Sequence, residues 1–389
     1  MSNYMKIVHI APNAPYNEGW GYQDNLLPKY HAKLGHDVTL IITTKQHSDG
    51  RLVKVPSCDY TSKDGFRVIR RDYKRCLISK YDSLFSKLDV YPLLCSIAPD
   101  FIFYHGLIST TIFDVIKYKK HHPNCIIVQD NHLDYNIGYN CANIKEWIIR
   151  CFYRNINRKS IPYVSKVYGV TPWRKKYAED YFKIPSSKTD VLIMGADDEK
   201  IDFIHREKIR SDIREKYCIS NDDFLIVTGG KIDKKKNVDI LMEACNSLEG
   251  VKLLIFGQVM DDVKESFETL LQKNKNILFI GWIESDKVYD YFFAADLVFF
   301  PGQHSVLWEQ ACAAKVPCVF RKWDGMEHVN NCGNSDFVSI VTVDSLKSKI
   351  NELKFTPKYF GMKKVAQSDS TDIYLYSNIV LKSLECAIK

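Results

Sequence analysis

The sequence predicts an α/β protein made of two doubly wound domains that follow each other along the chain. Three observations support this prediction: the chain has 389 residues, strand-like and helix-like segments alternate along it, and glycines follow several of the strand-like runs. This length exceeds what one hydrophobic core usually supports. Strands that alternate with helices are typical of parallel βαβ units.

The first series of strands and helices covers the N-terminal half of the chain. Gly35 ends a helix expected over residues 23–34, and Pro172 opens a later one. We therefore expect residues 1–197 to form the first domain. Its strands are expected over residues 6–10, 37–43, 101–104, 125–129, 164–170 and 189–194.

A second series begins near residues 197–204. Apolar residues at helical spacing from Val238 to Leu248 predict a helix after its first strand. We expect residues 198–365 to form the second domain and residues 366–389 to contain an amphipathic terminal helix, over residues 372–388. The remaining elements are expected as strands over residues 224–227, 251–256, 277–280, 297–300 and 318–320, and as helices over residues 289–294 and 305–314.

The composition is that of a globular protein of a reducing compartment. Hydrophobic residues make up 46% of the chain and charged residues 26%, which argues against disorder. The net charge of +7 is modest, and no nucleic-acid-binding signature accompanies it. No leader-like segment and no run of about 20 apolar residues is present, so we expect neither a signal peptide nor a membrane span. The 12 cysteines are scattered, which favours reduced thiols and a cytoplasmic location.

A lysine-rich loop follows the first strand of the second domain. Residues 229–237 read Gly-Gly-Lys-Ile-Asp-Lys-Lys-Lys-Asn, as a glycine turn between a strand and a helix. Glycines let a backbone approach a ligand closely, and positive side chains stabilise the charge on a departing diphosphate. Because lysines at a helix start oppose the helix dipole, this cluster indicates binding rather than solvated charges.

A second candidate loop lies at residues 301–311. A strand runs into Gly302 and then into a helix whose free N–H groups would face an anion. Glu309, on the first turns of that helix, can accept hydrogen bonds from the adjacent hydroxyls of a ribose. The alternative for Glu309 is an ordinary first-turn partner of the helix dipole.

Two further loops follow strands of the first domain. Gly19 and Gly21 follow the first strand, but they lack the G-x-G-x-x-G spacing of a dinucleotide fingerprint. His132 comes at the end of the strand expected over residues 125–129, at the edge where open α/β sheets bind ligands. A lone histidine is more often structural, but this one is placed where a ligand would be.

Together these loops resemble the GT-B glycosyltransferases, specifically the retaining enzymes of glycosyltransferase family 4. The resemblance covers nearly the whole chain and is strongest over residues 223–329. It implies two Rossmann-like domains that face a central cleft, with a terminal helix that crosses back to the first domain. It also implies a hexosyltransferase that moves a sugar from a nucleotide-diphosphate sugar to a hydroxyl acceptor, with retention of configuration.

The family pattern G-R-L-x-x-x-K-G is matched from Gly230 to Asn237. Lys231 replaces the usual Arg and Asn237 replaces the usual Gly, while Lys236 matches the family's Lys. The resemblance implies that Lys231 and Lys236 bind the donor diphosphate. An Arg-to-Lys change keeps the charge but loses the two-pronged fork of the guanidinium.

The family's E-x7-E motif is half present. Glu309 matches the second Glu, which holds the nucleotide ribose in the family, and the first Glu has no counterpart. The shortened loop is expected to leave Gln303 and His304, together with Ser305, near the donor sugar. Because the first Glu is missing, the sequence does not indicate which sugar is bound.

The resemblance also assigns roles in three other loops. His132 falls where the family places a His near the donor sugar and the reaction centre. Gly19 and Gly21 match a glycine loop that faces the diphosphate. Trp282 lies in the loop that should receive the nucleotide base.

No metal or other cofactor is expected. The sequence contains no Asp-x-Asp triplet, which enzymes that hold the diphosphate through a divalent metal commonly use. The expected partners are the nucleotide-sugar donor and a glycan or lipid-linked acceptor, with polysaccharide or glycolipid assembly as the setting. The alternatives are a sugar-nucleotide epimerase, which would need acid/base carboxylates, and a non-catalytic donor-binding subunit of a glycosyltransferase complex.

A basic amphipathic helix is expected at residues 145–159, and it suggests contact with an anionic membrane. Arginines and lysines alternate there with apolar residues such as Trp147 and Ile148. Such a helix can lie on the inner face of a membrane as a peripheral contact. The alternative is a helix packed on the first domain's sheet with solvated arginines.

Overall fold

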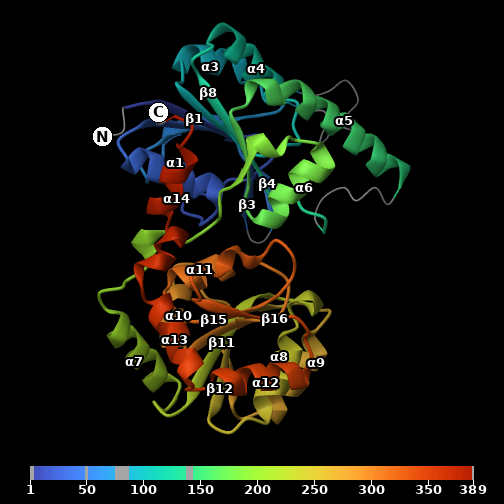
Figure 1. The fold of residues 1–389 in the computed structure, drawn as a ribbon. Coiled ribbons are helices and arrows are strands. Elements are labelled where there is room, and N and C mark those ends of the chain that lie inside the picture. The colour runs from blue at the N-terminus through green and yellow to red at the C-terminus, as the bar shows by residue number, and fades with distance from the viewer. Residues whose placement is uncertain (1–3, 49–50, 75–86, 137–142, 388–389) are drawn as a thin grey trace. The chain divides into compact units, whose positions relative to one another are not determined.

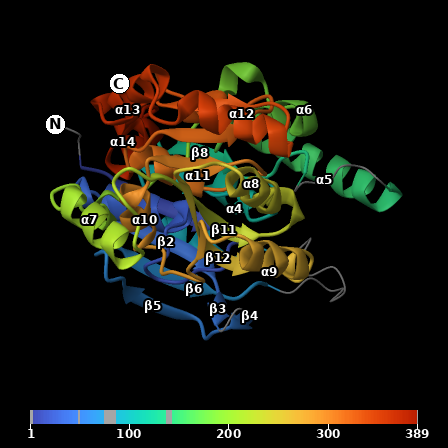
Figure 2. The same cartoon turned by 90° about the horizontal axis from the view of Figure 1, so that it is seen from below.

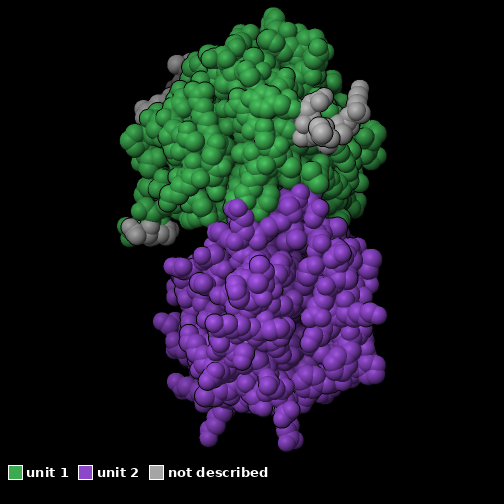
Figure 3. All heavy atoms as spheres, turned by 90° about the vertical axis from the view of Figure 1, so that its left-hand side faces the viewer, with its two compact units in different colours: residues 1–193, 379–389 green, residues 194–378 purple. Residues whose placement is uncertain are grey.

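The computed structural model describes residues 4–48, 51–74, 87–136 and 143–387. The chain divides into two compact units, each with its own parallel sheet (Figures 1 and 3). Unit 1 comprises residues 1–193 and 379–389, and unit 2 comprises residues 194–378. The last residues of the chain therefore return to the unit in which the chain begins. In the described part of the chain, every helix is too short or too polar to cross a membrane.

Unit 1 is built on an eight-stranded sheet. Its strand order is β10-β9-β8-β7-β1-β2-β6-β5, and only β5 runs antiparallel to its neighbour. The strands are β1 (Lys6–Ala11), β2 (Asp37–Thr43), β5 (Cys58–Thr61), β6 (Arg67–Arg71), β7 (Phe101–Tyr104), β8 (Ile126–Asn131), β9 (Lys166–Gly169) and β10 (Thr189–Val191), with β3 (Lys45–Ser48) and β4 (Arg51–Lys54) as a separate hairpin.

Helices cover this sheet and share its core. Apolar side chains of the helices at residues 112–121, 144–160 and 172–182 pack against the central strands. The strand residues of this core include Val8, Ile102 and Ile127, all with no exposed surface. The helices are α1 (Gln23–Lys33), α3 (Tyr91–Ile97), α4 (Ile112–His121), α5 (Ile144–Ser160) and α6 (Pro172–Phe182).

Unit 2 is built on a six-stranded, wholly parallel sheet with the order β13-β12-β11-β14-β15-β16. Its strands are β11 (Phe224–Ile232), β12 (Val251–Val259), β13 (Ile277–Phe279), β14 (Leu297–Phe300), β15 (Cys318–Arg321) and β16 (Ser335–Val338). Its helices are α7 (Arg206–Lys216), α8 (Val238–Asn246), α9 (Lys264–Lys273), α10 (Val288–Ala294), α11 (Leu307–Ala313), α12 (Val343–Leu353) and α13 (Pro357–Ala366) (Figures 1 and 2).

The strand order marks where each unit can bind a ligand. In unit 1 the order reverses between β1 and β7, and in unit 2 it reverses between β11 and β14. Ligands of open α/β sheets bind outside the carboxyl ends of the strands at such a reversal. The predicted α/β class with two doubly wound halves is confirmed. The loops singled out in the sequence follow β1 and β8 in unit 1, and β11, β13 and β14 in unit 2.

The prediction of a single helix over residues 372–388 was wrong. The structure has a 3-10 helix, Asp369–Tyr374, followed by α14 (Tyr376–Ser383). Leu375 between them is extended, with φ −89° and ψ 139°. Its neighbours hold it there, because the Ala196 amide donates to Tyr374 and the Tyr376 amide donates to Ala196. This backbone pairing breaks the helical repeat.

The glycine turn predicted after residues 224–227 was also wrong. Strand β11 continues through both glycines to Ile232 and stays paired with β12, Gly230 opposite Gly257. A Cβ atom on Gly257 would lie 1.9 Å from the Gly230 carbonyl oxygen. These glycines therefore serve close approach of two strands rather than reversal of the chain.

Candidate functional site

In unit 2 the lysine-rich loop is tied to the loop that follows β14. Asp233 accepts a hydrogen bond from the Lys235 amide (3.0 Å) at the start of the 3-10 helix Lys234–Lys236. Asn237 has φ 53°, in the left-handed region, and its side chain donates to the Pro301 carbonyl (3.0 Å). The lysines thus occupy a separate turn before α8, not the first turn of that helix as predicted.

Lys236 is the central cation of this loop. Its ammonium group donates to the Gln303 carbonyl at 2.6 Å and lies 3.4 Å from the His304 carbonyl. Burial lowers the pKa of Lys236 to about 8, and the charge of Asp233 opposes the shift. An ammonium group has three donors, so one N–H remains for an anion after both carbonyls are served.

Gly302 makes this arrangement possible. A Cβ atom at Gly302 would lie 2.2 Å from the Lys236 Cα and 2.4 Å from its carbonyl oxygen. The Gln303 amide also donates to the Lys235 carbonyl (2.8 Å). The two loops are therefore in direct backbone contact, which only a glycine at position 302 permits.

Lys231 and Gly230 lie near the carboxyl end of β11. Lys231 is exposed, so its side chain is available to a ligand. Gly230 has φ 106°, and a Cβ atom there would lie 2.9 Å from the Leu307 side chain. The joint binding of a diphosphate by Lys231 and Lys236 stays a prediction.

Glu309 is fully buried on α11 between two histidines. His304 Nε2 lies 2.8 Å and His328 Nε2 lies 2.7 Å from the same oxygen, Glu309 Oε1. Burial alone would raise the pKa of Glu309, but His304 and His328 outweigh it and lower the pKa to about 2. Glu309 is therefore an ionised carboxylate whose first oxygen is already engaged by the protein.

The second oxygen of Glu309 differs from the first. Glu309 Oε2 is buried and has no hydrogen-bond partner among the residues that the structure describes. A buried carboxylate oxygen without a partner is costly, which makes it the atom that a ribose hydroxyl would satisfy. The predicted ribose contact is therefore compatible with this geometry only through Oε2. His328 was not found by sequence reasoning.

The remaining predicted donor residues of unit 2 lie on two loops. α11 begins at Leu307, two residues later than predicted, and the Ser305 carbonyl accepts from the Trp308 amide (3.0 Å). Gln303 and Ser305 are half-buried. Trp282 follows β13 and is 73% exposed, so its indole ring is open to stacking by a base.

In unit 1 the predicted His132 lies beside a buried carboxylate, Asp130. His132 Nε2 is 3.3 Å from Asp130 Oδ2, and the same oxygen accepts from His105 Nδ1 at 2.7 Å. Asp130 Oδ1 accepts from the Gly106 amide (2.8 Å). Burial would raise the pKa of Asp130, but the two histidines outweigh it and hold that pKa far below its usual range.

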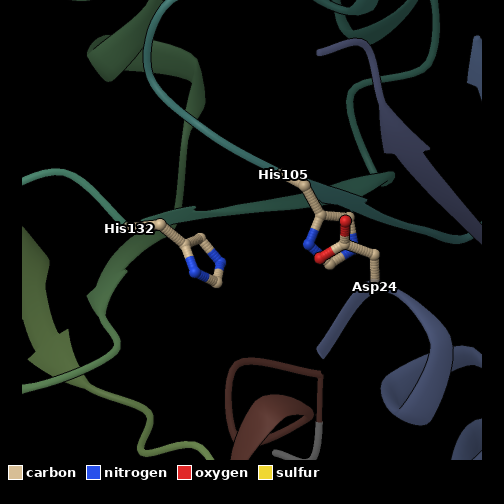
Figure 4. A group of neighbouring side chains, drawn as sticks. All are labelled: Asp24, His105 and His132. Atoms are coloured by element: carbon tan, nitrogen blue, oxygen red, sulfur yellow. The ribbon is translucent and has the colours of Figure 1, made fainter. Parts of the chain in front are cut away.

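Asp24 on α1 lies close to His105 and His132, and Figure 4 shows the three side chains together. Their potential ligand atoms all lie within 4.8 Å of one another. His105, however, already uses both ring nitrogens, Nδ1 toward Asp130 (2.7 Å) and Nε2 toward His9 (3.1 Å). A cation could take His105 as a ligand only by breaking one of these buried bonds, so the group does not fit a metal centre as it stands.

The glycine loop after β1 is anchored to the β3 strand. The Asn17 side chain donates to the His47 carbonyl (2.8 Å) and accepts from the His47 amide (2.8 Å). Gly19 has φ 79°, and a Cβ atom at Gly19 or Gly21 would meet nothing within 4 Å. The two glycines therefore border open space, as a phosphate-facing loop requires, although Gly21 has no conformational need to be glycine.

Sequence reasoning missed His9, His31 and His105. All three are buried and belong to one hydrogen-bonded group. His9 lies inside β1 with apolar residues on both sides of it in the sequence, and His105 directly follows β7. A histidine inside a buried strand was the available signal, because a core strand holds a polar ring only where it finds a partner.

Comparison with known proteins agrees with this architecture. Residues 209–359 match the family model described as glycosyl transferases group 1, and no curated protein matches the sequence significantly. A glycosyltransferase from Rickettsia africae ESF-5 superposes with a TM-score of 0.70 at 16% identity, over 99% of this chain and 98% of the other. The chain has the GT-B fold.

Two other solved structures show how much chemistry this GT-B fold accommodates. Anabaena Alr3699/HepE in complex with UDP superposes with a TM-score of 0.68 at 14% identity, over 98% of this chain and 99% of the other. The UDP-GlcNAc 2-epimerase from Neisseria meningitidis, bound to UDP-GlcNAc, has a TM-score of 0.58 at 14% identity, over 99% and 100%. At such identities the likeness establishes the fold and leaves the activity to the site.

Replacing both lysines of the loop should weaken nucleoside diphosphate binding. We expect Lys231→Ala combined with Lys236→Ala to raise the Kd for a nucleoside diphosphate by about 10- to 100-fold, the range for losing charge-assisted hydrogen bonds. Isothermal titration calorimetry measures this directly. The exposed neighbour Lys235 supplies the control, because Lys235→Ala should leave the Kd within about twofold. An unchanged Kd in the double variant would remove these lysines from the binding site.

The same loop predicts a pH dependence. Because the pKa of Lys236 is lowered to about 8, its ammonium form is complete below that pH and is lost as pH rises through it. We expect kcat/KM, which reports the free enzyme, to fall above about pH 8. Lys236→Arg keeps its charge at all accessible pH values, so this alkaline fall should vanish in that variant even where its rate is lower.

Glu309→Gln should weaken binding of a ribose-containing ligand while sparing pyrophosphate. The amide keeps one oxygen for the two histidines but replaces the unpartnered oxygen by a donor, which cannot accept a ribose hydroxyl. We expect a rise of about tenfold in the Kd for a nucleoside diphosphate, the value of one hydrogen bond to a charged group. Calorimetry with the nucleoside diphosphate and with inorganic pyrophosphate separates the two contributions; equal weakening of both would point to a general disturbance of α11.

Proposed function

We propose that the protein is a glycosyltransferase that moves a sugar from a nucleotide-diphosphate sugar to a hydroxyl acceptor. The observation that supports this most strongly is that the glycosyl transferases group 1 match, residues 209–359, falls on the unit that holds the half-buried Lys236 and Glu309, which has one oxygen left for a ligand. A cation fixed by two carbonyls and a carboxylate with one open oxygen are complementary to a diphosphate and a ribose.

In the proposed reaction the residues of unit 2 act on the nucleotide. Lys236 directs its remaining N–H at the diphosphate and stabilises the charge that develops as the sugar leaves. Lys231 adds a second positive charge, and Glu309 Oε2 accepts from the ribose. Trp282 offers a face to the base. Because these lysines supply the positive charge, we propose a reaction that proceeds without a divalent metal.

The residues of unit 1 are proposed to act on the sugar and acceptor. His132, held beside Asp130, contacts the donor sugar near the reacting carbon, and the glycines 19 and 21 leave room for phosphate. We propose retention of configuration as in glycosyltransferase family 4, without a protein nucleophile. A glycan or lipid-linked acceptor, and hence a role in polysaccharide or glycolipid assembly at the cytoplasmic side of a membrane, is part of this proposal.

The proposal is tested with a panel of nucleoside diphosphates and their sugars. UDP is the first ligand to try, because Alr3699/HepE was crystallised with it. We expect one nucleoside diphosphate to bind at least about tenfold more tightly than the others, since a base pocket discriminates by a few hydrogen bonds. We then expect the protein to release this nucleoside diphosphate from the corresponding nucleotide sugar faster when a glycan or polyprenol-linked acceptor is added.

The same experiment separates the alternatives. An epimerase would change the sugar in the donor without any acceptor, which NMR of the nucleotide sugar detects. A non-catalytic subunit would bind the donor and release nothing under all conditions. A protein that binds no member of the panel would refute the proposed function altogether.

The membrane contact is proposed from the exposed face of α5. Its later turns pack on unit 1 through Ile149, Tyr153 and Ile156, whereas its first turns expose apolar side chains. Ile144 is 72%, Trp147 48% and Ile148 55% exposed. Exposed apolar groups among basic residues suit an anionic bilayer surface.

Liposome co-sedimentation tests this contact. We expect binding to vesicles with about 30% phosphatidylserine and none to pure phosphatidylcholine, because polybasic binding depends on anionic lipid. Trp147→Ser with Ile148→Ser should reduce the bound fraction several-fold. Ile340→Ser, at an exposed residue of unit 2 (69%), is the matched control. The membrane proposal would be refuted if both variants bound equally well, or if the unchanged protein bound to neither kind of vesicle.

A further inference from the structure

A chain of buried hydrogen bonds runs through unit 1 from α14 to the carboxylate beside His132. His31 Nε2 lies 2.9 Å from Ser383 Oγ, and His31 Nδ1 lies 2.9 Å from His9 Nε2. His9 Nδ1 lies 3.1 Å from His105 Nε2, and His105 Nδ1 lies 2.7 Å from Asp130 Oδ2. Four successive contacts therefore join five side chains that are 0–6% exposed.

The Ser383 end fixes the direction of these hydrogen bonds. Ser383 Oγ lies 2.6 Å from the Val380 carbonyl oxygen. A carbonyl oxygen only accepts and a hydroxyl has one proton, so Ser383 donates to Val380. His31 Nε2 must then carry a proton and donate to Ser383.

The number of protons in the chain follows from this direction. Each of the four contacts needs one proton, and Ser383 supplies none of them. Three neutral imidazoles carry only one ring proton each, which is one too few. The row of hydrogen bonds from Ser383 to Asp130 therefore holds one proton more than neutral His31, His9 and His105 provide.

The charges around the three rings place this proton at the Asp130 end. Burial would lower the pKa of His105, but the charge and hydrogen bond of Asp130, with a further contribution from Asp24, outweigh it and raise the pKa. Burial lowers the pKa of His31 to about 3, and His36 and His105 add to the shift. Burial, His31 and His105 lower the pKa of His9 well below its usual value, against the charge of Asp130.

We propose that His105 is a buried imidazolium, stabilised by the Ser383–His31–His9 chain, and that its ion pair with Asp130 positions His132 for sugar transfer. The positioning part rests on the proposed function. His105 itself is a positioning residue, because both of its ring nitrogens are engaged by the protein. His132, 39% exposed, is the member of the group that a ligand can reach.

Asp130, which both His105 and His132 face, explains how the row of buried hydrogen bonds acts on His132. Asp130 Oδ2 faces His105 Nδ1 at 2.7 Å and His132 Nε2 at 3.3 Å. While His105 is charged, it neutralises Asp130, and His132 lies beside an ion pair instead of an isolated carboxylate. If His105 loses its second proton, Asp130 carries an unbalanced negative charge next to His132, and this changes the electric field at the His132 ring.

Nitrogen-15 NMR of the histidine-labelled full chain tests the proton count. A ring nitrogen that carries a proton and one that does not differ widely in chemical shift. We expect one histidine with two protonated ring nitrogens from about pH 6 to 8, and we expect His105→Gln to remove its signals. If His105 shows a single protonated nitrogen at pH 7, the inference is wrong, and this result does not depend on any activity.

Ser383→Ala tests the role of Ser383, the end of the hydrogen-bonded row that lies farthest from Asp130. Without the hydroxyl only three contacts remain, and three neutral imidazoles can serve them all. We therefore expect His105 to lose its second proton about one pH unit lower than in the unchanged protein, the equivalent of one lost hydrogen bond. Ser160→Ala is the matched control, because Ser160 is also buried and donates to a carbonyl three residues earlier (3.1 Å) but touches no histidine.

The pH profile of kcat tests the positioning role. We expect its alkaline limb to shift down by the same one unit or so in Ser383→Ala and to stay in place in Ser160→Ala. Ser383→Thr, which retains the hydroxyl, should restore the profile. A doubly protonated His105 with an unshifted profile would refute the positioning role alone, and absence of sugar transfer in the unchanged protein would refute the proposed function while the NMR result stands.

Discussion

A buried carboxylate held between two imidazoles is the interaction on which the candidate chemistry of each unit depends. Asp130 lies between His105 and His132 in unit 1, and Glu309 lies between His304 and His328 in unit 2. Removing a carboxylate from water costs several kcal/mol unless partners replace the lost solvent. The histidines supply that replacement, and as a result both carboxylates stay ionised.

The two carboxylates differ in what they leave open. Both oxygens of Asp130 have protein partners, so this residue can influence a ligand only through His132. Glu309 has one oxygen without a partner, so it can bind a ligand directly once solvent or substrate reaches it. A similar local arrangement therefore supports positioning in one unit and recognition in the other. The distinction rests on hydrogen-bond satisfaction and not on residue type.

The alternation of strands and helices was enough to predict the class of fold and most of its elements. Helix ends were less accurate, because they depend on contacts such as the Ala196 pairing that interrupts the terminal helix. The glycines 229 and 230 were recognised as special, but a turn and a close strand contact share the same signature in sequence. Only the position of Gly257 on the neighbouring strand distinguishes them.

The candidate site was predicted in part, and the omissions have one physical cause. Lys236 and Glu309 were found because each lies in a short segment of the sequence that matches a family pattern. His9, His31 and His105 lie in or after three separate segments, and it is the order of the strands β7, β1 and β8 together with α1 that gathers them. Partners that meet only through sheet order leave no local signal, so a buried histidine in a strand must be followed into the structure.

The loop that lacks the first Glu of the E-x7-E motif has a structural role of its own in this chain. His304 lies in the shortened loop, and its side chain is directed at Glu309 instead of being free for a sugar. His304 also contributes a carbonyl near Lys236 (3.4 Å). One residue therefore helps to fix both the carboxylate proposed for the ribose and the cation proposed for the diphosphate. His304 has this double structural role, and its side chain has little freedom to contact a sugar as well. Under the proposed function, selection of the sugar therefore relies on other side chains, and Gln303 and Ser305 are the nearest along the chain.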